Sequence, residues 1–295
     1  MRVGCVGMSS IDTALFVPAD LTHEAESVHM VDDVAVSLGG KGLIAAIAMS
    51  HEGVNIAPLA LVGHNSRIPP SIPDAISTDW LVPAQTDDSQ IWLTIGDSHR
   101  VAAFVATGHC SLSDAELDAL GAKYAQSVDA LYLSFEAVPL LRGAFTAAIS
   151  REIPVAVNLS RPLIDTLVAR DRGLLHELVA EADLILCNAD ESTRVLHALT
   201  VPTWSDVVGR NTSLVITEGD AGGMVHTPSD SEWKRYKPVK ASMVKSVVGA
   251  GDTFNGALLA AHWTQGLSII ESCKPAAALA SVCLGLPSSS ILGVL

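Results

Sequence analysis

Val247-Val248-Gly249-Ala250-Gly251-Asp252-Thr253-Phe254-Asn255-Gly256-Ala257 is the stretch of sequence on which the prediction of the fold depends. The two valines are typical of the end of a buried strand, and the residues from about 252 to 265 predict a helix. Gly249 and Gly251 allow a tight turn at the helix N-terminus, where free N–H groups and the helix dipole favour an anion. With the carboxylate of Asp252 beside it, this turn suggests phosphoryl transfer to a hydroxyl; the alternative is that Asp252 only caps the helix.

Strands and helices alternate along most of the 295 residues. The strand-like segments that fit this alternation are 2–8, 56–62, 130–135, 154–157, 184–187 and 214–217. Such alternation predicts a mostly parallel sheet with helices on both faces. The length is compatible with one large α/β domain, and we take residues 1–295 as that domain.

Two regions, within 14–36 and 78–106, break this alternation with short β-type segments, among them Trp80-Leu81-Val82. These segments are predicted to form a small separate sheet, which would act as a lid over the main sheet. Exposed lid strands invite pairing with a second copy of the chain, so a homodimer through the lid is expected.

A glycine turn, Gly39-Gly40-Lys41-Gly42, precedes a second buried helix that starts near Leu43. The turn is not a Walker A loop, because Lys41 is followed by glycine and not by Ser or Thr. Its glycines would let the backbone approach a ligand, and Lys41 would meet a polar group there. A packing turn with a solvent-facing lysine is the alternative.

Six polar residues come after predicted strands and are expected at one edge of the sheet, beside the turn at Gly249. They are Asp12, Glu136, Asn158, Asn188, Glu191 and Thr217. Any single one is explained as a turn or cap residue, but six at one edge indicate a functional site.

Composition restricts the partners and the compartment. There are 18 Lys+Arg against 32 Asp+Glu, a formal net charge of -14, which argues against a nucleic-acid partner. No apolar stretch is long enough to span a bilayer, and no membrane partner is expected. The five cysteines show no CxxC pair, which is typical of free thiols in a reducing compartment. We therefore expect a soluble cytoplasmic protein.

The motifs resemble those of the PfkB (ribokinase-like) family of sugar and nucleoside kinases, in order along nearly the whole chain. Gly39–Gly42 is similar to the first family signature and Val248–Ala257 to the second. Asn188-Ala189-Asp190-Glu191 matches the Asn-x-x-Glu element, and 217–222 matches the nucleotide-side Thr-x-Gly-x-x-Gly. The resemblance implies a ribokinase-like three-layer α/β/α sandwich with a small β lid.

The resemblance also implies a role for each matching residue. Asp252 would take the proton from the acceptor hydroxyl, and the transferring phosphoryl group would meet an anion hole made by Gly249, Ala250 and Gly251. ATP would be bordered by Asn188, Thr217, Gly219 and Gly222, and Mg²⁺ would be organised through water by Asn188 and Glu191. The acceptor would be held by Asp12, Gly40, Lys41 and Glu136.

Two positions depart from the family pattern. Ile44 stands where the first signature usually has Asn, so one contact to an acceptor hydroxyl is missing, which puts ribose itself in question. Ser246-Val247 replaces the usual Asp-Thr that helps to hold a monovalent cation, and this leaves K⁺ activation open.

The acceptor is expected to be a small unphosphorylated sugar or nucleoside. A phosphosugar would need several basic groups near the lid, and the lid candidates offer chiefly Arg67, His99 and Arg100. A nucleoside would need an apolar wall for its base, for which Trp80, Trp92 and Phe104 are candidates, with packing of the lid or of a dimer as the alternative.

Two other classes of protein remain as alternatives. The first is a catalytically weak sugar or nucleotide sensor on the same fold, which the departures at Ile44 and Ser246 keep open. The second, a Rossmann-type dehydrogenase, is weaker, because no GxGxxG follows the first strand.

Overall fold

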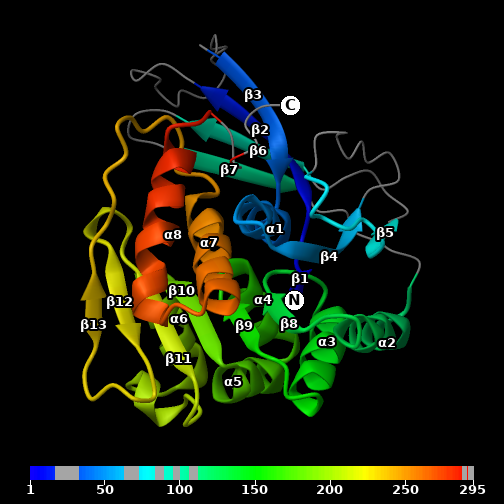
Figure 1. The fold of residues 1–295 in the computed structure, drawn as a ribbon. Helices are drawn as coiled ribbons and strands as arrows, with labels where there is room; N and C mark the ends of the chain where they lie inside the picture. The colour runs from blue at the N-terminus through cyan, green and yellow to red at the C-terminus, as the bar shows by residue number, and fades with distance from the viewer. Residues whose placement is uncertain are drawn as a thin grey trace.

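The computed structural model describes residues 1–16, 33–62, 73–83, 90–95, 100–105, 112–287 and 291. A central sheet lies between two layers of helices, and a second, smaller sheet lies at one end of the molecule (Figure 1). The predicted ribokinase-like α/β/α architecture with a mostly parallel central sheet is confirmed.

The central sheet has nine strands within the described residues, in the order β13-β12-β11-β10-β9-β8-β1-β4-β5. Pairing is parallel from β5 to β11, and β12 and β13 add an antiparallel edge. In chain order the strands are β1 (Arg2–Val6), β4 (Asn55–Val62), β5 (Leu81–Pro83), β8 (Ala130–Leu133), β9 (Val155–Asn158), β10 (Leu184–Asn188), β11 (Ser213–Thr217), β12 (Gly223–His226) and β13 (Lys234–Tyr236).

Helices cover both faces of this sheet. They are α1 (Lys41–His51), α2 (Asp114–Ala125), α3 (Val138–Ser150), α4 (Arg161–Arg170), α5 (Arg172–Glu181), α6 (Ala189–Leu199), α7 (Ala250–Gln265) and α8 (Ile269–Leu284), with short 3₁₀ helices at Trp204–Asp206 and Gly219–Ala221. One apolar core lies under α1, α7 and α8, and the other lies under α2 to α6. Successive residues of β10 alternate between these cores, as the two-residue period of a strand requires.

The second sheet has the strand order β3-β2-β6-β7 and is formed by β2 (Ser10–Phe16), β3 (Asp33–Gly39), β6 (Gln90–Ile95) and β7 (Arg100–Val105). Its strands overlap the two regions expected to break the alternation, although β2 begins before residue 14 and β3 ends after residue 36. The prediction for Trp80-Leu81-Val82 was wrong. Leu81 pairs in parallel with Ala60 of β4, so β5 extends the central sheet. A three-residue apolar segment carries no signal for its partner, because pairing depends on distant contacts.

Asp12 also lies elsewhere than expected. It belongs to β2 and not to the end of β1, which stops at Val6. The role of the second sheet as a lid stays a prediction. Arg67, His99 and the side chains of Trp92, Arg100 and Phe104 lie outside the described part of the molecule.

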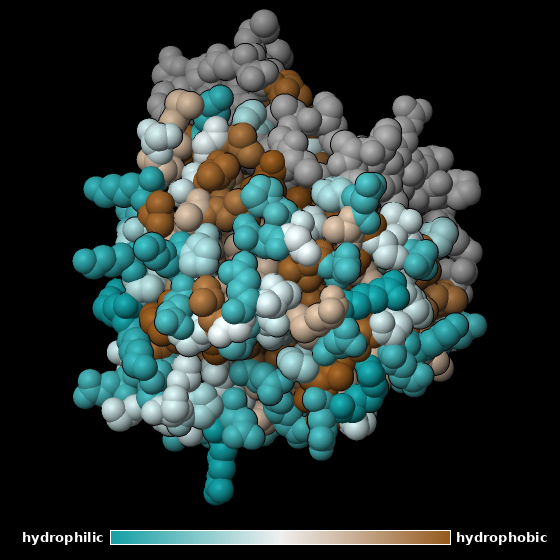
Figure 2. Space-filling model, viewed as in Figure 1, coloured by the Kyte–Doolittle hydropathy of each residue, from teal (hydrophilic) through white to brown (hydrophobic). Residues whose placement is uncertain are grey.

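In the described residues, no helix combines the length and the apolar character that a membrane crossing needs. The cysteines among them, Cys5, Cys187, Cys273 and Cys283, are buried free thiols. Figure 2 shows a mainly hydrophilic face, with apolar side chains gathered near the C-terminal end of α8. The large apolar side chains exposed in that part of the chain include Met243, Val244 and Val282.

Helices α1 and α7 approach each other closely through a glycine. A Cβ built on Gly256 would lie 2.3 Å from the carbonyl oxygen of Ala45 and 2.8 Å from the Cβ of Ala48. A side chain at this position would push the helices apart. Because Lys41 starts α1 and Asp252 lies in the first turn of α7, this contact also sets the distance between the two side chains.

We predict that Gly256→Ala lowers the free energy of unfolding by about 1–3 kcal/mol, because the added methyl group overpacks the contact between α1 and α7. Gly173→Ala is the matched control: among the described residues its Cβ would meet Asp171 Oδ1 alone, at 3.5 Å, so we expect a neutral or stabilising effect of up to ~1 kcal/mol. Urea unfolding followed by circular dichroism measures both. Equal stabilities of the two variants would contradict the prediction.

Candidate functional site

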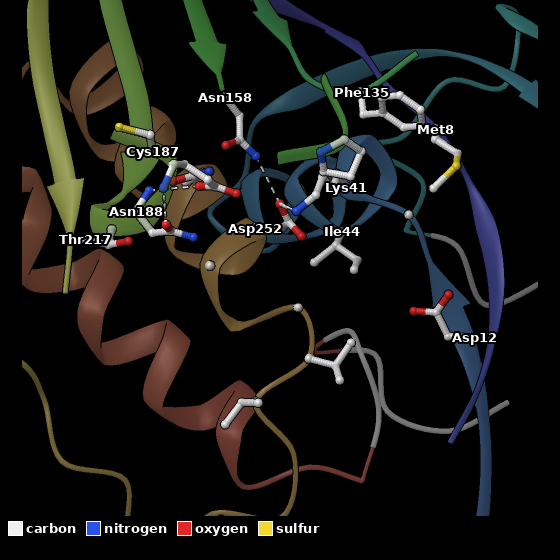
Figure 3. Close-up of a pocket in the computed structure, with 18 residues that line it drawn as sticks. Met8, Asp12, Lys41, Ile44, Phe135, Asn158, Cys187, Asn188, Thr217 and Asp252 are labelled. Carbon is white, nitrogen blue, oxygen red and sulfur yellow. Dashed lines mark hydrogen bonds and ion pairs between the residues drawn. The ribbon is translucent and has the colours of Figure 1, made fainter. Parts of the chain in front are cut away.

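A cavity of about 540 Å³ opens at the carboxyl edge of the central sheet, between that sheet and the start of α7. Asn158, Asn188 and Thr217 are the last residues of β9, β10 and β11, and all three line the cavity. Figure 3 shows these strand ends on one side of Asp252 and Asp12 on the other. Parallel strands therefore deliver polar side chains from distant parts of the sequence to one place.

The floor of the cavity is the start of α7. Gly249 is the N-cap residue and has a φ of 76°, a left-handed conformation that glycine adopts without strain. The helix begins at Ala250, two residues earlier than predicted, so Asp252 lies inside its first turn. Among the described residues, and apart from the chain neighbours and the backbone of the helix itself, no atom lies within 4 Å of a Cβ built on Gly251, which leaves open space over this turn. The first N–H groups of a helix lack intrahelical acceptors, so the turn can bind an anion.

Asp252 is buried, with a relative exposure of 8%. The Nζ atom of Lys41 lies 3.6 Å from its Oδ1, and the side-chain amide of Asn158 donates a hydrogen bond to the same oxygen at 3.3 Å. Both contacts are visible in Figure 3. A cation and an amide donor thus offset the cost of burying this carboxylate.

Asn188 and Glu191 form a capping box at the start of α6. Asn188 Oδ1 accepts from the Glu191 N–H at 2.8 Å, and Glu191 Oε2 accepts from the Asn188 N–H at 2.9 Å. Glu191 Oε1 accepts from the N–H of Arg161 at 3.0 Å. Glu191 lies in the helix at the third position after the cap, and not directly after a strand as expected.

These two residues fit a magnesium ion bound through water. Both residues line the cavity, and their side chains carry oxygen atoms, which are the ligands that Mg²⁺ prefers. Within the described residues, no group of three or more His, Cys, Asp or Glu side chains could hold a metal ion by itself. This donor set suits an ion that keeps several waters and is shared with substrate phosphates, and not a closed protein cage.

Asp12 is buried at the far end of the cavity, with a relative exposure of 2%. Ser10 Oγ donates to its Oδ1 at 2.7 Å. A Cβ on Gly39 would lie 2.0 Å from the Asp12 carboxyl carbon, so only glycine leaves room for this carboxylate. The apolar side chains of Met8, Ile44 and Phe135 line the same cavity, and Figure 3 shows Met8 and Phe135 together.

A second cavity, of about 590 Å³, shares Thr217, Val247 and Gly251 with the first. Its remaining lining is largely apolar and includes Tyr236 and Phe254, whose rings stack with centroids 5.5 Å apart. The two cavities therefore meet over the first turn of α7.

Of the predicted site residues, all but Glu136 line one or both cavities. The first cavity brings together Asp12, Gly40, Lys41, Asn188, Glu191, Thr217, Gly249, Gly251 and Asp252. The second is lined by Thr217, Gly219, Gly222, Ala250 and Gly251.

Sequence reasoning assigned no role to Asn158, Asn255, Met8 or Phe135, although all four line the first cavity. Asn158 was expected only as a polar residue at a strand end. The position of Asn255, one helical turn after Asp252, was a usable signal. Trp80, a candidate either for the wall of a nucleobase or for packing, packs edge-on against Tyr124 with ring centroids 5.3 Å apart and lines neither cavity.

Glu136 follows β8, as expected, but its carboxylate faces backbone and not the cavity. It accepts from the N–H of Ala137 at 2.9 Å and from that of Leu61 at 3.5 Å. Burial raises the pKa of Glu136 to about 7, and these two hydrogen bonds reduce the shift.

We predict that Glu136 makes folding less favourable as pH rises. Its pKa is higher in the folded than in the unfolded state, so between about pH 4.5 and pH 7 the folded protein still holds a proton that the unfolded chain has released. Relative to Glu136→Gln, the wild type should lose on the order of 2 kcal/mol of unfolding free energy over this range. Urea unfolding at several pH values measures this difference, with exposed Glu177→Gln as the control. A pH-independent difference would contradict the prediction.

Comparison with known proteins places the chain in a family. The model of the pfkB family carbohydrate kinase matches residues 2–292. A nucleoside kinase from Burkholderia thailandensis, solved in complex with inosine, has 16% identity and a TM-score of 0.80, covering 99% of this chain and 94% of its own. A nucleoside kinase from Methanocaldococcus jannaschii has 17% identity and a TM-score of 0.76, with the same coverage. A ribokinase from Cryptococcus neoformans, solved with ADP, has 18% identity and a TM-score of 0.74 and covers 99% and 96%. These structures share the fold, and the match of the family model over nearly the whole chain shows that the protein belongs to the pfkB family of carbohydrate kinases.

Proposed function

We propose that the protein transfers the γ-phosphate of ATP to a hydroxyl of a small unphosphorylated sugar or nucleoside. The observation that carries this proposal is the position of Asp252. Its carboxylate lies in the first turn of α7, where two cavities of substrate size meet above the N-terminus of a helix. A site that must bring a phosphate donor and an acceptor together requires such an arrangement.

The second cavity suits the donor. Its apolar walls and the Tyr236–Phe254 stack offer a surface for a nucleobase, and Gly219 and Gly222 border it. A triphosphate extending from this cavity would pass Gly251, which both cavities share. The N–H groups of Gly249, Ala250 and Gly251 would stabilise the charge that develops on the transferring phosphoryl group, without reorganising.

In the first cavity Asp252 would accept the proton of the attacking hydroxyl. Lys41, 3.6 Å away, keeps positive charge beside the reacting groups. A magnesium ion, held through water by Asn188 and Glu191, would neutralise the phosphate charge when bound. Asp12 would accept hydrogen bonds from acceptor hydroxyls, with Gly40 beside it in the cavity wall. Glu136 would contact the acceptor only after its side chain rotates toward the cavity.

A nucleoside is the more specific candidate for the acceptor. Met8, Ile44 and Phe135 present apolar surface in the same cavity as the Asp12 carboxylate. An apolar wall suits a base, and a buried carboxylate suits the hydroxyls of the attached sugar. The nucleoside kinase from Burkholderia thailandensis was solved with inosine. A catalytically weak sensor with the same ligands is the alternative, and product formation from ATP separates the two.

A homodimer through the four-stranded sheet is part of the proposal. Its outer strand β3 exposes Val34 and Val36, with relative exposures of 49% and 37%. Apolar side chains on an edge strand are a surface for pairing with a second copy.

We predict that Asp252→Asn reduces phosphoryl transfer by about 10²–10⁴-fold, because the amide cannot take the proton. The nucleotide dissociation constant should change little, since the helix N-terminus remains. Phosphorylated product measured by mass spectrometry, together with calorimetric titration of an ATP analogue, tests this. An unchanged rate would show that the catalytic role of Asp252 is wrong.

A panel of sugars and nucleosides, tested with ATP and Mg²⁺ and with or without K⁺, tests the acceptor. We expect nucleosides to be phosphorylated more efficiently than free ribose. Turnover should not require K⁺, because Ser246 carries no charge and its hydroxyl accepts the N–H of Val248 at 3.1 Å.

Phe135→Ala should raise KM for the best nucleoside about 10-fold, the order expected for loss of an aromatic contact. Exposed Trp233→Ala is the control. Equal effects on a nucleoside and a free sugar would contradict a base-binding wall.

A further inference from the structure

We infer that Asn158 is a positioning residue, which orients the carboxylate of Asp252 for proton transfer by donating its side-chain amide to one oxygen. The inference rests on the proposed function and adds to it a residue that matches none of the family motifs identified in the sequence. Figure 3 shows the Asn158 side chain directed at Asp252 from the end of its strand.

The position of Asn158 is fixed by its strand. It is the last residue of β9 and pairs with Leu186 of the neighbouring strand β10. Its relative exposure is 5%. Alternation along β9 places Val155 and Val157 in the core under α2 to α6, and Ala156 in the core under α1, α7 and α8. Asn158 shares the face of Ala156, so its side chain points toward α7.

The backbone around Asn158 is also constrained. The next residue, Leu159, donates its N–H to the carbonyl of Leu186 at 2.9 Å, and Ser160 donates to the carbonyl of Asn158 at 2.9 Å. The backbone that carries the amide in contact with Asp252 Oδ1 at 3.3 Å is therefore held by the sheet on one side and by a turn on the other. A donor held in this way restricts the rotation of the carboxylate it binds.

Lys41 contacts the same oxygen but differs in kind. Its side chain is 32% exposed and long, so it supplies charge more than orientation. Asn158 is short, buried and neutral. The two residues therefore have different roles at Oδ1. Lys41 offsets the negative charge of Asp252, and Asn158 orients the Asp252 carboxylate.

The groups that face Asp252 make this role testable by pH. Besides Lys41 on α1, the titratable side chains of the described residues that interact with it electrostatically include Cys5 on β1, Tyr132 on β8 and Cys283 on α8. Burial raises the pKa of both thiols and of the phenol, so all three are neutral at physiological pH. An acidic group at position 158 would be a new ionisable group beside Asp252.

The experiment compares Asn158→Asp and Asn158→Ala with the wild type. Asn211→Asp makes the same change in an exposed turn and is the control for net charge. Two carboxylates about one hydrogen bond apart disfavour each other's ionisation, so the acidic limb of the kcat profile of Asn158→Asp should move up by about one pH unit or more. Asn158→Ala should lower kcat about 100-fold and change KM for ATP and for acceptor less than threefold, because it loosens the reacting geometry and not the binding.

Three results would overturn the inference: an acidic limb of Asn158→Asp identical to that of Asn211→Asp, a kcat of Asn158→Ala within twofold of wild type, or a loss confined to KM for MgATP. The last would make Asn158 a nucleotide or metal contact. Thermal unfolding of each variant identifies a variant that fails to fold, and the other substitution then decides.

A different result would contradict the proposed function: neither the wild type nor Asn211→Asp would turn over any acceptor. In that case the contact itself is still measured by the ¹³C carboxyl titration of Asp252, assigned through Asp252→Asn. A titration of Asp252 unchanged in Asn158→Asp would show that the two side chains do not interact in solution.

Discussion

The site depends on the close approach of two helix N-termini. Gly256 lets α7 contact the backbone of α1 at Ala45, and a Cβ on Gly42 would lie 2.6 Å from the backbone of Gly7 after β1. Both contacts lack room for a side chain. They bring Lys41 and Asp252 together although the two residues are more than two hundred positions apart in sequence. The small residues of the two glycine motifs therefore serve the packing of the helices as much as the binding of a ligand.

The second constraint is the cost of a buried carboxylate. Asp252 and Asp12 are almost without solvent contact, and both keep polar partners: Lys41 and Asn158 for the first, Ser10 for the second. The two carboxylates and the amide donor come from different elements: Asp12 from the second sheet, Asp252 from α7 and Asn158 from the central sheet. The site is thus assembled from independent elements, and its buried carboxylates have local polar partners in a strongly acidic chain.

Much of this was predictable from the sequence because it is local. The strand–helix alternation gave the layered fold, and the glycine turns marked the starts of α1 and α7 within two residues. Long-range contacts were not predictable. The three residues of β5 could join either sheet, and only their pairing with β4 decides. Asn158 resembles any polar residue at a strand end, since its contact with Asp252 spans 94 positions. Phe135 was not predicted as a site residue, because the acceptor contact was assigned to its charged neighbour Glu136.

Val247 has a consequence for chemical selectivity. Its side chain is 53% exposed and lines both cavities, at the point where a donor phosphate and an acceptor would meet. An isopropyl group offers a water molecule no side-chain hydrogen bond there, so water gains little orientation for attack. Under the proposed function, wasteful hydrolysis of the donor is disfavoured by an apolar junction in the chain itself, before any closure of the site. A hydroxyl on a bound acceptor does not depend on such a hydrogen bond for its orientation, because the rest of the acceptor molecule holds it in place.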